Sequence, residues 1–149
     1  MNSSSNCCEK WAPCARAVLR IIVGLLFLQH GTQKLFGWPA PSPMGGTLPP
    51  MMVFGAWLEF AGGLLFVLGL LTRPVAFILC GEMAVAFWKF HFKPDAHLPL
   101  VNKGELAVVY CFVFFYFIFA GAGSASLDKL ICCKKCAPTD EGGVNQQKT

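Results

Sequence analysis

The chain has 149 residues, of which 55% are hydrophobic and only 13% are charged. A soluble domain of this size needs about 25% charged residues to cover its surface, so water is not its sole solvent. The mean hydropathy of +0.55 excludes a disordered chain. A scattered net charge of +4 does not indicate a nucleic-acid partner. The composition instead indicates a protein whose main partner is the lipid bilayer.

Four apolar segments are long enough to cross a bilayer core, which takes about 20 residues per helix. In chain order they are residues 17–36, 52–71, 74–90 and 106–127. Only Leu71-Thr72-Arg73-Pro74 separates the second from the third, and proline fits the first turn of a helix, so these two are expected to form an antiparallel hairpin. The sequence therefore predicts an all-α fold, a four-helix transmembrane bundle.

The predicted domain organisation is one membrane domain with two short tails. Residues 1–16 are a polar, cysteine-containing N-terminal tail, residues 17–128 the membrane domain, and residues 129–149 a C-terminal tail containing Cys and Lys. Residues 1–13 and 134–149 are polar enough to be frayed. Pro and Gly in residues 37–51, and two prolines in residues 91–103, indicate loops.

The distribution of basic residues predicts the orientation of the helices. Four spans place both termini and the Arg73 turn on one side. Eight basic residues then lie on that side: Lys10, Arg16, Arg20, Arg73, Lys129, Lys134, Lys135 and Lys148. The other side holds Lys34, Lys89, Lys93 and Lys103. By the positive-inside rule, this predicts a multi-pass membrane protein with both termini in the cytoplasm.

Ionisable residues lie within the predicted spans, where they are costly and usually face the interior of a bundle. Glu59 and His30 lie at similar depths, about 10 Å below the outer surface for a helical rise of about 1.5 Å per residue. Glu82 lies about 12 Å from the inner surface. Gly55, Glu59 and Gly63 are four residues apart and so share one face of the helix. Because small residues let backbones approach, this face, with Glu59, is expected to point at a neighbouring helix.

These positions predict an outward-opening polar pocket. His30, Glu59 and Glu82 are its candidate catalytic residues, because partly desolvated carboxylates and imidazoles can hold and pass protons. The candidate binding residues are Gln29, Lys34, Trp57, Phe60, Asn102 and Glu105, with the two aromatic residues holding a ring. The alternative is that Glu59 pairs with His30 or Lys34 and only fixes helix packing.

Six of the eight cysteines lie in the tails: Cys7, Cys8, Cys14, Cys132, Cys133 and Cys136. Cys133 and Cys136 have C-x-x-C spacing with two lysines between them. This spacing suits a redox pair, or a zinc site if the two tails meet. Palmitoylation and ordinary reduced thiols are the alternatives. Cys80 and Cys111 are expected to be small core residues. His91 and His97 fit no zinc spacing, so no metal site is predicted.

Residues 20–128 resemble the DoxX family of small membrane proteins. The resemblance rests on RIIVGLLFLQHG at residues 20–31 with Lys34, EFAGG at 59–63, GLLTR at 69–73, NKGE at 102–105 and GAGSASLD at 121–128. It implies a four-helix membrane protein associated with oxidoreductase assemblies, since relatives include thiosulfate:quinone oxidoreductase subunits and proteins linked to oxidative and thiol stress. The family's polar positions correspond to His30, Lys34, Glu59, Arg73, Asn102, Gly104, Glu105 and Asp128.

The residues and the resemblance together favour a redox-associated membrane component, acting as an oxidoreductase subunit that binds a quinone-like carrier. No NAD, FAD or ATP motif is present. The sequence leaves the cofactor unknown, and a quinone is compatible with the pocket. A noncatalytic scaffold for an oxidoreductase complex and a pathway for protons or small solutes are the alternatives. A soluble or membrane oxidoreductase partner and a homo-oligomer are both compatible with the sequence.

Overall fold

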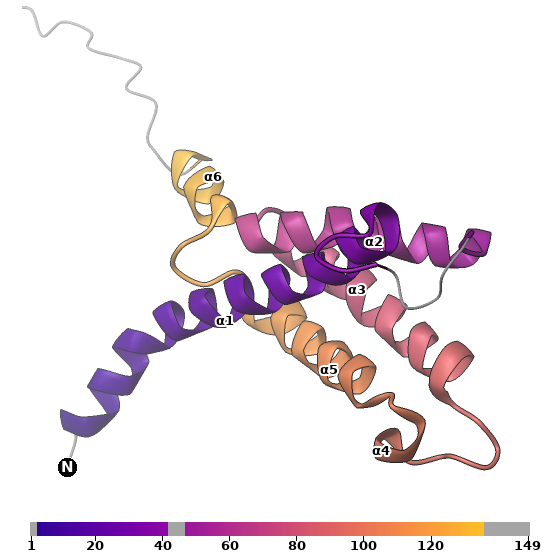
Figure 1. Cartoon of the computed structure of the whole chain (residues 1–149). Coiled ribbons are helices and arrows are strands. Elements are labelled where there is room, and N and C mark those ends of the chain that lie inside the picture. Colours follow the sequence, from indigo (N-terminus) through magenta and orange to yellow (C-terminus); the bar gives the residue numbers. More distant parts are fainter. Residues whose placement is uncertain (1–2, 42–46, 136–149) are drawn as a thin grey trace, which may run out of the picture.

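The computed structural model describes the backbone of residues 3–41 and 47–135, and the side chains of residues 9–41 and 47–131. The described part of the chain is all-helical (Figure 1). Its helices are α1 (Ser3–Phe36), α2 (Pro50–Leu68), α3 (Thr72–Ala86), α4 (Pro99–Asn102), α5 (Glu105–Ala120) and α6 (Leu127–Lys135). A π-helical turn, Phe87–His91, extends α3. The predicted fold class is thus confirmed at the level of an all-α protein.

Two of these helices are long and apolar enough to cross a membrane. They are the Glu9–Phe36 part of α1, with a mean hydropathy of 1.7, and α2, with a mean hydropathy of 1.9. Helix α5 is apolar but has 16 residues. Helix α3 has 15 residues and carries Arg73 and Glu82. Membrane-spanning character is therefore supported for two helices, and the four-span arrangement is taken up below as a proposal.

Helix α1 begins at Ser3, well before the predicted start at residue 17, so residues expected to fray are helical. This segment is held by the end of α5. The carbonyl of Pro13 accepts a hydrogen bond from the Ser124 backbone at 3.2 Å, and Arg16 donates to the Ala120 carbonyl. Tertiary contacts of this kind stabilise helices that sequence propensity alone does not favour.

The predicted fourth helix is too long, because α5 ends at Ala120 instead of continuing to residue 127. Gly121 and Gly123 follow with φ of 70° and 85°, a region that favours glycine. A Cβ at Gly123 would also lie 2.7 Å from the Pro13 carbonyl oxygen. The chain therefore leaves the helix here, and α6 begins separately at Leu127.

The long helices pack as two pairs, α1 with α2 and α3 with α5. The α1–α2 contact is close because of glycines: a Cβ at Gly31 would lie 2.5 Å from the Phe60 nitrogen, and one at Gly63 would lie 3.0 Å from the Leu28 nitrogen. Helices α2 and α3 meet at the turn of residues 69–71 and spread apart away from it (Figure 1). We call the end of the molecule at this turn the turn end, and the opposite end, near α4, the loop end.

The core lies between the two pairs and is built largely from phenylalanine. Phe114 of α5 packs edge-on against Phe27 of α1 at 4.9 Å and against Phe66 of α2 at 5.1 Å, and Phe117 contacts Phe66 at 5.0 Å. Leu79 of α3 is buried in the same cluster. These aromatic contacts join the pairs beneath the space that opens toward the loop end.

Candidate functional site

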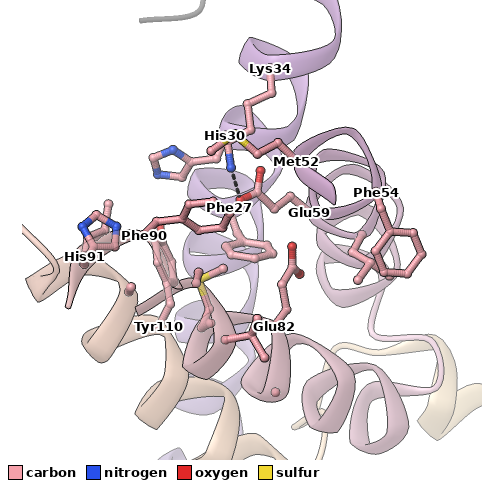
Figure 2. Close-up of a pocket in the computed structure, with 18 of the residues that line it drawn as sticks. Phe27, His30, Lys34, Met52, Phe54, Glu59, Glu82, Phe90, His91 and Tyr110 are labelled. Atoms are coloured by element: carbon pink, nitrogen blue, oxygen red, sulfur yellow. Dashed lines mark hydrogen bonds and ion pairs between the residues drawn. The ribbon is translucent and has the colours of Figure 1, made fainter. Parts of the chain in front are cut away.

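A cavity of about 740 Å³ lies between the two helix pairs, toward the loop end (Figure 2). Residues of α1, α2, α3, the π-turn and α5 line it, and most of them are apolar. Its polar members are His30, Lys34, Glu59, Glu82, His91, Lys103 and Tyr110. This volume and this mostly apolar lining with a few polar groups are typical of a small-molecule site.

Glu59 of α2 is the most deeply buried acid at the cavity, with 4% of its surface exposed. Its Oε1 forms an ion pair with Lys34 Nζ of α1 at 2.5 Å. Its other oxygen, Oε2, is buried and has no hydrogen-bond partner among the described residues. The sequence allowed Glu59 to pair with either His30 or Lys34, and in the structure it pairs with Lys34. One of its two carboxylate oxygens remains unpaired.

Glu82 of α3 supplies a second carboxylate to the same cavity. Its Oε2 is also buried with no hydrogen-bond partner in the described part of the chain. Its Oε1 lies close to α2, since a Cβ at Gly55 would be 3.3 Å away. Buried polar atoms are nearly always hydrogen-bonded in proteins, so two unpaired carboxylate oxygens beside one cavity point to a ligand or to bound water.

His30 and Tyr110 form one wall of the cavity. The half-buried His30 ring lies edge-on to the Tyr110 ring of α5, with the centroids 6.0 Å apart. Phe27, one turn before His30, packs edge-on against the same tyrosine at 5.1 Å. The three candidate catalytic residues, His30, Glu59 and Glu82, are thus brought to one cavity from three different helices (Figure 2).

Three of the candidate binding residues point away from this cavity. Residues two apart on a helix are about 200° apart around its axis, and neighbours about 100°. Trp57 therefore faces away from Glu59, and Phe60 is turned to the side. Both contact Phe36 in an aromatic cluster at the end of α1. Gln29 is next to His30 on α1 and so points about 100° away from it around the helix axis. Its side chain is exposed.

Asn102 and Glu105 are not among the residues that line the cavity either. The Asn102 side chain shapes the loop before α5, accepting a hydrogen bond from the Gly104 nitrogen at 2.8 Å and donating to the Ala96 carbonyl at 3.1 Å. Glu105 is exposed in the first turn of α5, where a carboxylate is favourable to the helix dipole. Their neighbours Lys103 and Leu106 line the cavity instead.

Sequence reasoning missed most of the apolar lining. Phe27, Phe54, Phe90 and Met83 line the cavity but have the same character as any residue of a membrane helix. Phe27 alone carried a signal, because it lies three residues before His30 and so shares its face. The other lining residues follow from how the helices cross.

A second polar cluster at the turn end centres on Arg20, which is 1% exposed. Its guanidinium donates to three carbonyl oxygens: Ala122 at 2.5 Å, Ala125 at 2.6 Å and Val67 at 3.2 Å. Arg20 thereby joins the end of α2 to the chain that follows α5.

Asp128 closes the same end of the molecule. It accepts hydrogen bonds from the Leu71 and Thr72 nitrogens at 2.7 and 2.9 Å, at the start of α3. Arg73 donates to the Phe119 carbonyl at 3.3 Å. Two of the polar positions that the DoxX resemblance singled out, Arg73 and Asp128, therefore hold helix ends together at the turn end and do not line the cavity.

Two cysteines within helices lie side by side. Cys80 Sγ of α3 and Cys111 Sγ of α5 are 3.7 Å apart, and both are free thiols packed against the core. Cys14 is exposed. The side chains of the five other tail cysteines, Cys7, Cys8, Cys132, Cys133 and Cys136, lie outside the described residues. Within the described side chains, no three His, Cys, Asp or Glu residues gather as metal ligands would.

The fold and site define an all-helical protein with membrane-type helices around an apolar cavity that contains carboxylates. Comparison with known families assigns it further: residues 15–92 match the DoxX family. The chain is 41% identical over 124 residues to an uncharacterized protein of Haemophilus influenzae, covering 80% of this chain and 92% of that relative. No solved structure matches it. This protein belongs to the DoxX family, as its sequence motifs predicted.

Proposed function

We propose that this DoxX protein binds a quinone-like carrier in the cavity and exchanges protons with it. The observation that carries the proposal is the pair of buried, unpaired carboxylate oxygens, on Glu59 and Glu82, beside an apolar space. A quinone ring fits an apolar site, and its two oxygens need hydrogen-bond partners there. A protonated carboxyl group donates to a quinone oxygen, and a carboxylate accepts from a quinol hydroxyl.

The aromatic residues around the cavity suit a flat ring better than the two expected from the sequence. Phe27, Phe90 and Tyr110 take the role that the sequence suggested for Trp57 and Phe60. Offset and edge-on contacts between rings contribute about 0.5–1.5 kcal/mol each beyond the burial of their area. His30, beside Tyr110, is the third proton-exchanging group in this proposal.

Reduction of a quinone takes two electrons and two protons. In our proposal this chain supplies the protons and the binding site, and a partner oxidoreductase supplies the electrons. The protein is then one subunit of a membrane oxidoreductase assembly. A noncatalytic scaffold would hold the same partner without binding the carrier, and this difference separates the two functions experimentally.

We further propose that four helices cross the bilayer, with both termini in the cytoplasm. α1 and α2 satisfy the length and hydropathy requirement by themselves. α3 and its π-turn together run from Thr72 to His91, which at a rise of about 1.5 Å per residue is about 30 Å, the thickness of a bilayer core. The basic residues Arg16, Arg20 and Arg73 then lie at the cytoplasmic turn end.

The direct test is quinone binding to the purified protein in lipid nanodiscs. We expect Glu82→Gln and Glu59→Gln each to weaken binding about tenfold, the loss of one charge-assisted hydrogen bond of about 1.5 kcal/mol. Glu105→Gln removes an exposed acid that does not line the cavity, and is the matched control. Binding that is unchanged in both cavity variants would contradict the proposed site.

Gly81 allows the cavity to be filled without disturbing helix packing. It lines the cavity, and a Cβ added there meets no atom within 4 Å. We expect Gly81→Phe to abolish quinone binding while Gly81→Ala retains it, with both variants folded. A wild-type protein that binds no quinone but still co-purifies with an oxidoreductase would favour the scaffold function instead.

A further inference from the structure

The cavity opens sideways, between α2 and α3, and its rim there is apolar. Phe54 of α2 is 65% exposed, and Ile78 and Val85 of α3 are 51% and 53% exposed, yet all three also line the cavity. Helices α2 and α3 spread apart from their turn (Figure 1), and these three side chains are the large exposed apolar residues that line the cavity along the two helices between Phe54 and Val85. Large exposed apolar side chains at the mouth of a site are unfavourable in water and favourable in lipid.

The carboxylate of Glu82 lies directly behind this opening. A Cβ at Gly55 of α2 would be only 3.3 Å from Glu82 Oε1, whereas one at Gly81 of α3 would meet nothing within 4 Å. Both glycines line the cavity. Each helix therefore leaves space at the gap, and the apolar rim residues and Glu82, whose Oε2 has no partner among the described residues, line the same cavity.

The environment outside the opening follows from the helices that form it. α2 passes the length and hydropathy requirement for a membrane span. In the four-span arrangement proposed above, the exposed side of α2 at Phe54 is covered by acyl chains and not by water. A ligand that enters here comes from the bilayer and crosses no aqueous boundary on its way to Glu82.

We infer that the gap between α2 and α3 is a lateral entrance for a membrane-dissolved amphiphile. This inference rests on the proposed function and names its ligand class. The polar ring reaches Glu82 and Glu59, and an apolar tail stays in the gap between Phe54 on one side and Ile78 and Val85 on the other. A tail in this gap exchanges contacts with acyl chains for contacts with the rim side chains, so it adds affinity through packing and not through removal from water.

The test compares two benzoquinones with the same ring, one carrying a decyl tail and one without a tail, on the full chain in nanodiscs. Ile78→Trp and Val85→Trp narrow the gap at exposed positions, where a larger side chain does not disturb the core. We expect each to weaken binding of the decyl compound about tenfold, because the indole ring takes the space of the tail and crowding of this kind costs about 1–3 kcal/mol. Binding of the tail-less compound is expected to be unchanged. Ile22→Trp, at an exposed position of α1 that does not line the cavity, is the matched control.

Each other outcome overturns a defined part of the inference. If the rim variants leave both compounds unaffected while Glu82→Gln weakens both, the lateral entrance is wrong and the proposed function stands. If the rim variants weaken both compounds equally, the gap holds the ring and not a tail. If Glu82→Gln and Glu59→Gln also have no effect, the proposed function and the inference fail together.

Discussion

Three individual side chains define the chemistry of this protein at the residue scale: Arg20, Glu59 and Glu82. Arg20 is nearly completely buried and donates to three carbonyl oxygens through its two terminal nitrogens, while its Nε has no hydrogen-bond partner among the described residues. Glu59 is buried and satisfied on one oxygen only, and Glu82 also retains an unpaired one. The guanidinium is held by carbonyl oxygens of the protein, whereas both glutamates line the cavity and have an oxygen available for a ligand there. The two clusters therefore have different roles, structural at the turn end and functional at the cavity.

Replacement of Arg20 tests the structural role. Arg20→Ala leaves the carbonyls of Val67, Ala122 and Ala125 without their donor, at a cost of about 3 kcal/mol or more for charge-assisted hydrogen bonds. Arg20→Lys is expected to rescue little, because one ammonium cannot reproduce the planar fork of donors. Thermal unfolding in detergent measures both variants. Lys129→Ala, at an exposed position, is the control, and an equal effect in this control would contradict the prediction.

The ion pair between Lys34 and Glu59 can be tested by a double-mutant cycle. The Lys34 side chain is 32% exposed, so solvent weakens the pair relative to a fully buried one. We expect Lys34→Met alone to cost about 2 kcal/mol, between the values for exposed and buried pairs. Adding Glu59→Gln to Lys34→Met should recover most of this stability, since the uncompensated charge is then removed. Simple additivity of the two changes would show that the residues do not interact.

At the scale of elements, glycine spacing decides how the helices pack. Gly31 and Gly63 bring α1 and α2 into backbone contact, while Gly81 of α3 has open space around it. The same residue type thus closes one helix pair and leaves room at the cavity. The pairing of α1 with α2 and of α3 with α5 follows from such contacts, and the cavity lies where the pairs diverge.

The two glycines predict opposite effects of the same substitution. Gly31→Ala places a methyl group 2.5 Å from the Phe60 nitrogen, a backbone atom that cannot move aside. We expect a loss of about 1–3 kcal/mol from overpacking. Gly81→Ala should instead stabilise by about 0.5–1 kcal/mol, through the better helix propensity of alanine. Stabilisation by Gly31→Ala similar to that by Gly81→Ala would show that α1 and α2 are not packed as described.

The contact between α3 and α5 can be tested through Cys80 and Cys111. Their Sγ atoms are 3.7 Å apart, so a small movement brings them to disulfide-bonding distance. With the six tail cysteines replaced by serine, we expect mild oxidation to link the helices. Trypsin cleavage after Lys103 would then leave two fragments joined until a thiol reductant is added. Cys111→Ser is the control, and separate fragments without reductant would contradict the helix pairing.

On the scale of the whole molecule, the two ends differ in construction. The turn end is closed by arginine and aspartate hydrogen bonds to helix ends, and the loop end holds the cavity. This asymmetry suits a membrane protein in which one side is fixed and the other accepts a ligand. The orientation of the chain in the membrane therefore decides on which side of the membrane the cavity lies.

Cysteine labelling tests the proposed orientation. In a chain whose cysteines are otherwise replaced, the exposed Cys14 marks the turn end, and Ala40→Cys marks the loop end. We expect a membrane-impermeant maleimide to label residue 40 in intact cells and Cys14 only after the inner face is made accessible. The reverse pattern would place the termini outside, against the positive-inside rule. Inverted vesicles provide the control.

Much of the candidate site was predictable because charge in a membrane helix is rare and carries information. His30, Lys34, Glu59 and Glu82 were all identified from depth and polarity, and the structure places all four at one cavity. Such reasoning could not decide whether Trp57 and Phe60 face the cavity, because aromatic residues are equally acceptable facing lipid, another helix or a ligand. Their direction depends on the rotation of α2, which follows from the Gly31 and Gly63 contacts.

By itself, the sequence determined the all-helical class, the family and the short list of polar residues, because composition, motif order and hydropathy are local properties. Only the tertiary structure decided where α5 ends, since the Gly121 region is shaped by contacts with Pro13 and Arg20 from the far end of the chain. It likewise decided that Glu59 pairs with Lys34 and that Glu82 lies behind an apolar opening. These outcomes depend on how the helices cross and rotate, and helix crossing depends on contacts between residues distant in the chain.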